Sequence, residues 1–475
     1  MLPASAHQSP FHGFPPADPV LAQLEAARAT AHHGPSARRP RQGSALCLSG
    51  GGFRAALFHL GAVRRLDELG VLGSLRSLSA VSGGAVLATL LLHPDLEWPD
   101  ADGGGGRVGG LAELVAAPLL ALARRNLRTP ALLSRVSPRG WGRPDPSVQV
   151  LADELERAVP WWGTDLREHR RRGGPVVLTG ATEIGYGVSW LFADPRSAGP
   201  RGRIGDHRLG HAAPPPGLRL VDSVAASCAY PPFFGPLELD GADLGLTGGA
   251  ADPDEPEAVR EAIRRRIQLV DGGVYDNLAL EPVWSDHATV LVSDGGAVFG
   301  GRPAGSVLSR LGRLLSIASS GGQTARLRWL RAGFAAGTLA GATWSLDSPA
   351  DLRRGSGPGS PGPLLDGYDP EVVGAIHRVR TDLDAFSPDE QMVLCRYGYL
   401  VADASIRRHS PQVVRRDAAL LPPHPQVAAG ADALSAARLG SDHRARAALS
   451  DGVCRTAGAQ QPPRRRTGWQ DELPP

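Results

Sequence analysis

The sequence predicts an α/β fold in which a central, mostly parallel sheet is flanked by helices. A strand, a glycine-containing turn and a helix follow one another twice between residues 44 and 91, which is how parallel α/β sheets begin. The second of these helices, near residues 83–91, is apolar on nearly every side, as is typical of a helix buried between layers. The hydrophobic content of 42% is sufficient for a large core.

The first strand-helix unit has a clear periodicity. Residues 45–48 form a short apolar strand that runs into a turn of three consecutive glycines. The helix that follows carries Phe58, Ala62, Leu66 and Leu69 on one face, at the spacing of an amphipathic helix.

The second unit and the later elements complete the predicted sheet and its helices. Residues 75–81 read as a strand, and Ser82 opens the apolar helix. Further strands are expected at 176–180, 267–270 and 289–293, and further helices near 111–126, 147–158, 308–340 and 370–385.

Composition predicts long loops and tails around this core. The chain contains 60 glycines and 42 prolines in 475 residues, well above their usual share. Two insertions, about 194–217 and 240–256, are expected to be long surface loops, with a lid over the site as the alternative. We expect a disordered N-terminal segment at 1–43, one folded domain at 44–404 (core motifs 44–296, helical extension 297–404) and a largely disordered tail at 405–475.

Charge and cysteine usage exclude several functions. All 51 basic residues are arginine, so Schiff-base chemistry, a lysine-containing phosphate loop and a serine-lysine dyad are excluded. A net charge of +3 does not indicate a nucleic-acid partner. The four cysteines are far apart, which predicts free thiols and no zinc site. With no signal peptide or apolar span visible, we expect a cytoplasmic protein without a metal or cofactor.

The three glycines of the first turn, Gly50, Gly51 and Gly52, are candidates for an anion site. Glycine permits backbone conformations that a Cβ forbids, and the first amides of the following helix have no intrahelical acceptor. The anion is either a phosphate or a developing oxyanion. A dinucleotide site is disfavoured because no convincing acidic residue ends the next strand.

The second turn has the form of a nucleophile elbow. Ser82 lies between small residues where a strand turns into a helix, so its hydroxyl can project and the helix N-terminus favours nearby negative charge. A Ser-Gly-Gly turn is also a common helix cap. The glycine turn one strand earlier favours the nucleophile.

A serine nucleophile needs a base, and Asp271 is the candidate. It ends a strand and precedes two glycines that allow close backbone approach, and a carboxylate in a desolvated site can act as general base. The alternative is a simple turn aspartate. Asp294 repeats the Asp-Gly-Gly pattern after the next strand, so only one of the two can be the partner.

A Ser-His-Asp triad is the competing mechanism, with His59, His287 and His377 as available bases. Against it, the glycines precede Ser82 by only one strand-helix-strand unit, whereas an α/β-hydrolase places more sheet between its oxyanion loop and its nucleophile. We expect His59 to have a packing role.

Taken in order, the segments SGGGFRA (49–55), FHLG (58–61), SAVSGG (79–84) and VDGG (270–273) resemble the patatin-like phospholipase family. That family shares a serine-aspartate dyad with cytosolic phospholipase A2. Lesser matches are Ala-Thr at 181–182 and the segment ASCAYPPF at 226–233. Two departures are Ala80 and Ala55, each a small residue where the family usually has glycine.

The resemblance implies a three-layer patatin-like fold and a role for each matched residue. Ser82 would be the nucleophile and Asp271 its base, while Gly50, Gly51 and Gly52 would supply oxyanion-hole amides. Asp294 would be structural. Substrate-binding positions carried over from the family are Phe53, Arg54 and Gly83, with Arg54 near the hole or a phosphate.

The implied function is a lipid acyl hydrolase of phospholipase A or lysophospholipase type, acting through an acyl-serine intermediate. Its partner would be a phospholipid or lysophospholipid, with peripheral membrane contact as a further expectation. The alternatives are a transacylase that uses the same dyad and a catalytically degenerate scaffold that binds lipid or protein.

Overall fold

The computed structural model describes most of the chain between residues 41 and 428. The described residues are 41–100, 105–135, 145–194, 203–250, 254–296, 307–348, 368, 370–428, 432, 434 and 435. The predicted disordered segments, 1–43 and 405–475, lie mostly outside these residues.

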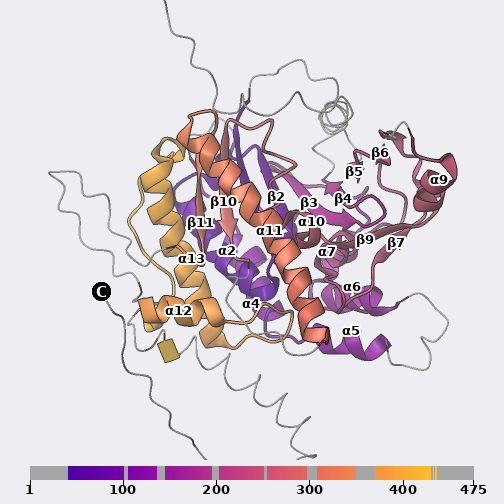
Figure 1. The fold of residues 1–475 in the computed structure, drawn as a ribbon. Coiled ribbons are helices and arrows are strands. Elements are labelled where there is room, and N and C mark those ends of the chain that lie inside the picture. Colours follow the sequence, from indigo (N-terminus) through magenta and orange to yellow (C-terminus); the bar gives the residue numbers. More distant parts are fainter. Residues whose placement is uncertain are drawn as a thin grey trace, which may run out of the picture.

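The described residues form one eleven-stranded sheet whose centre is parallel (Figure 1). The parallel strands run in the order β11 (Ala340–Ser345), β10 (Thr289–Asp294), β1 (Ser44–Leu48), β2 (Ser77–Val81) and β3 (Val176–Glu183). Antiparallel strands extend it from β3 through β4 (Val188–Ala193), β5 (Arg203–Asp206), β6 (Gly210–Ala212) and β8 (Thr247–Gly248). A second antiparallel branch joins β3 to β9 (Ile267–Asp271) and then to β7 (Leu237–Leu239).

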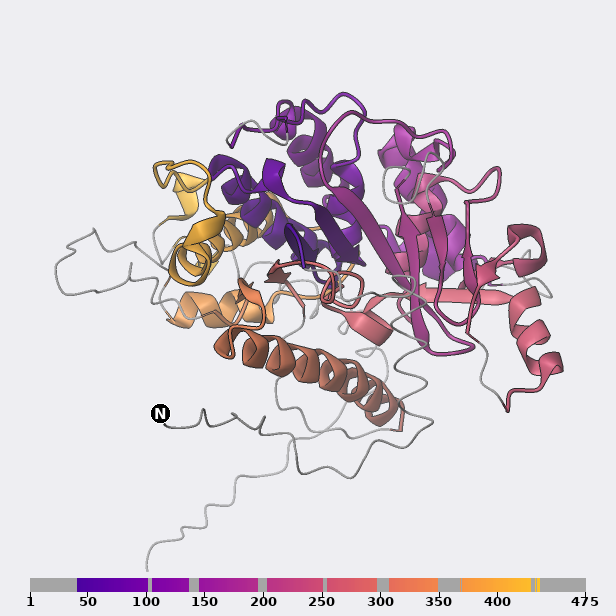
Figure 2. The ribbon, with the colours of Figure 1, turned by 90° about the horizontal axis from the view of Figure 1, so that it is seen from above.

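Helices cover both faces of the sheet, so the predicted α/β class with a parallel centre is confirmed. Leu46 and Leu48 of β1 face the larger core, which contains residues of α2 (Gly52–Glu68), α3 (Gly83–Leu90), α7 (Leu220–Cys228) and α13 (Pro388–His409). Ala45 and Cys47 face the smaller core, with Leu330 of α11 (Val307–Ala335). Figure 2, seen from above, shows α11 along one outer side of the molecule.

The helix after the glycine turn is enclosed by a second helix. A Cβ added to Gly61 of α2 would overlap the carbonyl oxygen of Cys395, and one added to Gly398 of α13 would overlap that of Phe58. The two backbones therefore touch, and α2 is buried between α13 and the sheet.

The remaining elements are short or peripheral. They are η1 (Leu72–Ser74), the π-helical η2 (Leu111–Ala116), α4 (Ala117–Leu122), α5 (Arg128–Arg135), α6 (Ser147–Ala158), η4 (Pro160–Gly163), α8 (Gly241–Leu244), α9 (Glu257–Arg265), α10 (Gly273–Asp276), α12 (Pro370–Arg378), η5 (Pro411–Val413) and η6 (Pro425–Val427).

Three predicted boundaries need correction. The insertions 194–217 and 240–256 are not simply long loops, because they contain β5, β6 and β8, which extend the sheet. The helix predicted at 308–340 ends at Ala335, and β11 follows it as an unpredicted edge strand. The predicted domain end at residue 404 falls inside α13.

The chain after α13 also packs against the domain. Val413 and Val427 are buried, and the buried Arg65 of α2 donates to the carbonyl oxygens of Ala418 and Ala419. The folded unit therefore includes residues up to about 428.

Candidate active site

Strand register brings the two predicted turns to the same edge of the sheet. Leu48 of β1 is opposite Ala80 of β2 on one side and Ser293 of β10 on the other. Because these three strands are parallel, their carboxyl ends lie together. The glycine turn, Ser82 and Asp294 are therefore neighbours.

Asp271 reaches the same place from the opposite direction. Val81, the last residue of β2, pairs with Gly180 of β3, and Asp271, the last residue of β9, pairs with Ala181. The strand β4 occupies the other edge of β3, so β2 and β9 follow each other along one edge and end tip to tip. This arrangement joins two residues 189 positions apart.

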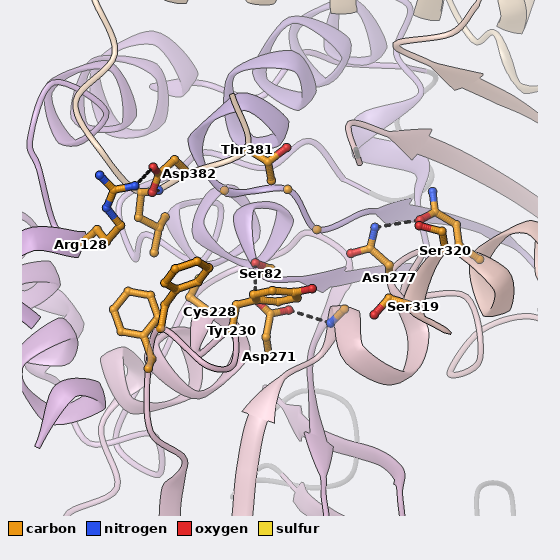
Figure 3. Close-up of a pocket in the computed structure, with 18 residues that line it drawn as sticks. Ser82, Arg128, Cys228, Tyr230, Asp271, Asn277, Ser319, Ser320, Thr381 and Asp382 are labelled. Carbon is orange, nitrogen blue, oxygen red and sulfur yellow. Dashed lines mark hydrogen bonds and ion pairs between the residues drawn. The ribbon is translucent and has the colours of Figure 1, made fainter. Parts of the chain in front are cut away.

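Ser82 and Asp271 are hydrogen-bonded at this junction (Figure 3). The Ser82 hydroxyl donates to Oδ2 of Asp271 at 2.7 Å, and the amide of Gly273 donates to Oδ1 at 2.7 Å. Ser82 is 7% exposed and Asp271 is 3% exposed. The carboxylate is thus oriented by two donors, one of them the candidate nucleophile.

Ser82 has a strained backbone that the surrounding strands hold in place. Its φ of 51° and ψ of −124° lie in a region that L-residues rarely adopt. Its amide donates to Oγ of Ser227 at 2.8 Å, and the Ser227 hydroxyl donates to the Gly180 carbonyl at 2.6 Å. Ser227, within the segment 226–233, therefore fixes the elbow against β3.

Burial raises the pKa of Asp271 to about 7, although the hydrogen bonds from Ser82 and Gly273 act to lower it. Burial also raises the pKa of the Cys228 thiol and of Tyr230, with the Asp271 charge as the second cause in both. At neutral pH the group that titrates next to Ser82 is therefore Asp271.

The glycine turn packs directly on Ser82, and two of its three amides donate to no acceptor among the described residues. A Cβ added to Gly50 would lie 3.1 Å from the Ser82 Cβ. The Gly50 amide donates to the Asn277 carbonyl at 3.0 Å, so the expectation that Gly50 supplies an oxyanion donor is corrected. The amides of Gly51 and Gly52 have no backbone acceptor within the part of the chain that the structure describes.

The backbone conformation of the turn depends on positive φ values at Gly51 and Gly52. Gly51 has φ 142° and Gly52 has φ 59°, both in the region that favours glycine. Gly83 serves the same contact, since a Cβ there would overlap the Gly52 carbonyl oxygen. Gly83 is not among the described residues that line the cavity, and its contact with substrate stays a prediction.

Phe53 and Arg54 also lie outside the pocket. Phe53 is fully buried and packs edge-on against Phe386. The Arg54 guanidinium donates to the carbonyl oxygens of Val379 at 2.9 Å and Gly295 at 3.2 Å, and burial lowers its pKa to about 10. The predicted contacts of both residues with substrate are therefore corrected, because both side chains stabilise the base of α2.

A cavity of about 380 Å³ opens above the Ser82–Asp271 pair (Figure 3). One part of its wall is mainly apolar, with Cys228, Tyr230, Phe233, Phe234 and Leu383. Another part carries uncharged polar groups, from Asn277, Ser319, Ser320, Gln323 and Thr381. The pocket thus offers both an apolar and a hydrogen-bonding surface to a ligand.

Arg128 and Asp382 form an ion pair in the wall of this cavity. Arg128 also lies 3.8 Å from Asp384. Among the described residues that line the cavity, Arg128 is the one cation. Sequence reasoning missed this pair, since neither residue belongs to a motif and they are 254 positions apart.

Asp294 is held in a network beside the dyad and does not contact Ser82. Its Oδ2 accepts from the Gln323 amide at 2.7 Å, and the Asn277 amide donates to Gln323 Oε1 at 3.1 Å. The second Asp-Gly-Gly pattern therefore connects α11 to the loop after β9.

Histidine is absent from the described residues that line the cavity. His59 is buried and its ring bonds to Oγ of Ser293 at 2.7 Å and to the Ser49 carbonyl at 3.0 Å. His287 bonds to the Val283 carbonyl and to Ser77. His377 bonds to the Leu346 carbonyl oxygen, so the contacts of all three candidate histidines leave the triad alternative without a base at Ser82.

Across the described residues, no group of three His, Cys, Asp or Glu side chains gathers as a metal site. None of the helices in that part of the chain combines the length and the apolar character needed to cross a bilayer.

Comparison with known proteins agrees with the motifs. The family model described as "Patatin-like phospholipase" matches residues 46–102 and 202–284, which include the glycine turn, Ser82 and Asp271. The predicted resemblance to that family is therefore confirmed. A search of curated proteins gave no match.

Similar solved structures include a human GIVD cytosolic phospholipase A2, with a TM-score of 0.42, 14% identity, and coverage of 83% of this chain and 66% of that one. The same enzyme with methyl gamma-linolenyl fluorophosphonate has a TM-score of 0.39 and 16% identity, with coverage of 88% and 64%. VipD from Legionella pneumophila has a TM-score of 0.29 and 13% identity, with coverage of 78% and 67%. The chain thus spans slightly less than two thirds of the phospholipase A2 chains.

Proposed function

We propose that this protein hydrolyses carboxylic ester bonds of lipids through an acyl-Ser82 intermediate, with Asp271 as the general base. The observation that carries the proposal is the 2.7 Å hydrogen bond from the Ser82 hydroxyl to Asp271 at the floor of the cavity. The match of the patatin-like phospholipase model to both segments supports a lipid hydrolase in general.

In the acylation step, the Ser82 proton moves to Oδ2 of Asp271 while Oγ forms a bond to the ester carbonyl carbon. The carbonyl π electrons move to oxygen, which becomes an oxyanion next to the amides of Gly51 and Gly52. When the tetrahedral intermediate collapses, the bond to the alkoxy oxygen breaks. The departing alcohol takes the proton from Asp271, which is again a carboxylate.

In the deacylation step, a water molecule takes the place of the alcohol. Asp271 accepts a proton from that water as its oxygen bonds to the acyl carbon. Collapse of the second tetrahedral intermediate breaks the bond to Oγ, and the proton returns to Ser82. The fatty acid leaves, and the dyad recovers its starting protonation.

The raised pKa of Asp271 suits this role. A general base works best when its pKa lies near the operating pH, and a carboxylate at the usual value would accept the serine proton much less readily. Burial supplies the shift, and the two hydrogen bonds to the carboxylate keep it oriented.

The cavity wall fits a substrate with an apolar chain and a polar head. This supports an enzyme of the phospholipase A or lysophospholipase type. The aromatic part of the wall fits an acyl chain, and the hydroxyl and amide groups fit an oxygen-rich alcohol. Arg128 is the cation available to a phosphate, since a guanidinium has five donors and retains some when paired with Asp382.

The experiment that tests the proposal compares Ser82→Ala, Asp271→Asn and Asp294→Asn in an ester hydrolysis assay. Ser82→Ala and Asp271→Asn should each lower kcat by at least about a thousandfold, as losses of a nucleophile and of its base do. Asp294→Asn should stay within about tenfold of wild type, because it alters only the neighbouring network. Full activity in Ser82→Ala, or loss only in Asp294→Asn, would refute the dyad.

A further inference from the structure

The helix α11 exposes a face that carries apolar side chains in its N-terminal half and arginines along its length. Among its described side chains, Val307 is 71% exposed, Leu314 is 61% exposed and Ile317 is 47% exposed. Exposed arginines continue the same face at the three- and four-residue spacing of a helix. In chain order the exposed positions of this face are Val307, Arg310, Leu314, Ile317, Gly321, Thr324, Arg328 and Arg331.

The charge of this helix has one sign. Residues 307–335 contain five arginines and no aspartate or glutamate. Apolar side chains interleaved with arginine on one face are typical of helices that lie in the interface of an anionic bilayer. A nucleic-acid partner would use the arginines but would leave Leu314 and Ile317 without a role.

The same helix forms part of the catalytic cavity. Ser319 and Ser320, two and three residues after Ile317, line the cavity, as does Gln323 one turn later. Phe233 also lines it and is 48% exposed, which places an apolar ring at the rim. By helical spacing, Ser319 and Gln323 lie on the other side of α11 from Leu314 and Ile317, so the helix contributes one side to the cavity and exposes the other.

The middle of α11 is anchored to the segment that follows Asp271. Gln323 bonds to Asp294 and Asn277, and the Arg326 guanidinium donates to the Tyr275 carbonyl at 2.9 Å. Arg326 also lies over the Tyr275 ring, 4.9 Å from its centroid. The outer face of α11 is thus fixed in orientation relative to the cavity. Figures 1 and 2 both show this helix on the outside of the molecule.

From the exposure and the charge of this face we infer that α11 docks on the surface of an anionic lipid bilayer. Leu314 and Ile317 enter the headgroup region, and Arg310, Arg328 and Arg331 lie against lipid phosphates. This inference rests on the proposed function, since it names the lipid surface on which such an enzyme would act, but the two are tested separately.

Binding is measured by co-sedimentation in a Ser82→Ala background, so that the vesicles are not hydrolysed. The Ser82→Ala protein with an unchanged α11 face should bind vesicles of phosphatidylcholine and phosphatidylglycerol. It should bind vesicles of pure phosphatidylcholine much more weakly. The double change Leu314→Ser and Ile317→Ser should lower binding at least about tenfold. Arg310→Gln with Arg328→Gln should lower it by a similar factor and weaken its salt dependence.

Two matched controls lie on α9, at the opposite end of the sheet from β11 (Figure 1). Val259→Ser removes an apolar side chain that is 48% exposed, and Arg265→Gln removes an exposed arginine. Both should bind vesicles like wild type. With Ser82 restored, the α11 variants should hydrolyse a short water-soluble ester at the wild-type rate, which separates loss of docking from loss of the dyad or of the fold.

Three results would overturn the inference. The first is equal binding by the α11 variants and the α9 controls. The second is equal binding to neutral and anionic vesicles, or to neither. The third is a dimer in solution that the Leu314→Ser and Ile317→Ser change converts to a monomer, since the face would then be occupied by a second copy of the chain.

Discussion

Asp271 couples the chemistry of the site to its stability, because its burial raises its pKa to about 7 from an ordinary value of 3.8. The folded protein keeps the Asp271 proton up to about pH 7, whereas the unfolded chain loses it near pH 4. As pH rises through that window the unfolded state binds fewer protons than the folded one, so the stability contributed by this group falls.

The raised pKa of Asp271 predicts how both catalytic activity and stability depend on pH. We expect kcat/KM to rise with pH through an apparent pKa of about 7, since the base must be ionised. Asp271→Asn should be inactive yet more stable than wild type at pH 8, by at most about 4 kcal/mol, and the gain should disappear toward pH 4. Urea unfolding across pH 4–8 measures this. A wild-type protein as stable as Asp271→Asn at pH 8 would show that burial does not destabilise the charged carboxylate of Asp271.

Arg128 is the residue whose loss should discriminate between head groups. Arg128→Gln should raise KM about tenfold for a lysophospholipid and leave it unchanged for a monoacylglycerol with the same acyl chain, because only the former carries a phosphate. Arg157→Gln, an exposed ion-pair residue on α6, is the control. Equal increases in KM for both substrates would assign Arg128 a purely structural role.

Individual motif residues could be predicted from the sequence, whereas the directions of their side chains could not. Ser82 and Asp271 are predictable because each lies in a short local pattern, a strand end followed by two glycines, and because these patterns occur in a family-like order with the glycine turn. The orientation of the Arg54 side chain depends on the Val379 carbonyl, which is 325 positions away in the sequence, so no local pattern predicts that orientation. The pairing of Arg128 with Asp382 was unpredictable for the same reason.

At the scale of elements, the site depends on the junction where β2, β3, β9 and α7 meet. Ser227 of α7 connects the Ser82 amide to the Gly180 carbonyl, and the Asp271 amide donates to the Ala229 carbonyl at 3.0 Å. A single helix end thus aligns both members of the dyad.

Removing that link should misplace the nucleophile without removing it. Ser227→Ala leaves the buried Ser82 amide unpaired, which costs about 1–3 kcal/mol, and we expect kcat to fall at least tenfold with little change in KM. Ser223→Ala, on the same helix, loses only a bond to the Leu220 carbonyl and should keep wild-type kcat. Steady-state kinetics and thermal unfolding of the two variants give the comparison. Equal kcat values would remove Ser227 from the positioning of Ser82.

The antiparallel direction of β9 could not be predicted from the sequence. Its apolar pattern and terminal aspartate identify a strand, but nothing local distinguishes a parallel neighbour from an antiparallel one. Its place is set by its partner β3, whose carboxyl end extends three residues beyond β2 and offers an edge to which β9 pairs in the antiparallel direction.

At the scale of the molecule, α13 encloses the helix of the glycine motif and α11 supplies part of the cavity wall. The parallel centre and the helical layers were predictable because each unit repeats strand, turn and helix. The contact of α13 with α2 through Gly61 and Gly398, and the cavity wall supplied by α11, depend on packing between distant segments. No periodicity within one segment carries that information.

The central claim is that Ser82 is a nucleophile activated by Asp271. It is tested most directly by reacting the full chain with a fluorophosphonate probe and identifying the modified residue by peptide mass spectrometry. We predict a single label on Ser82, absent in Ser82→Ala, at least a hundredfold slower in Asp271→Asn, and unchanged in Asp294→Asn. A label on another residue, or labelling of Ser82 at the same rate in Asp271→Asn, would contradict the account.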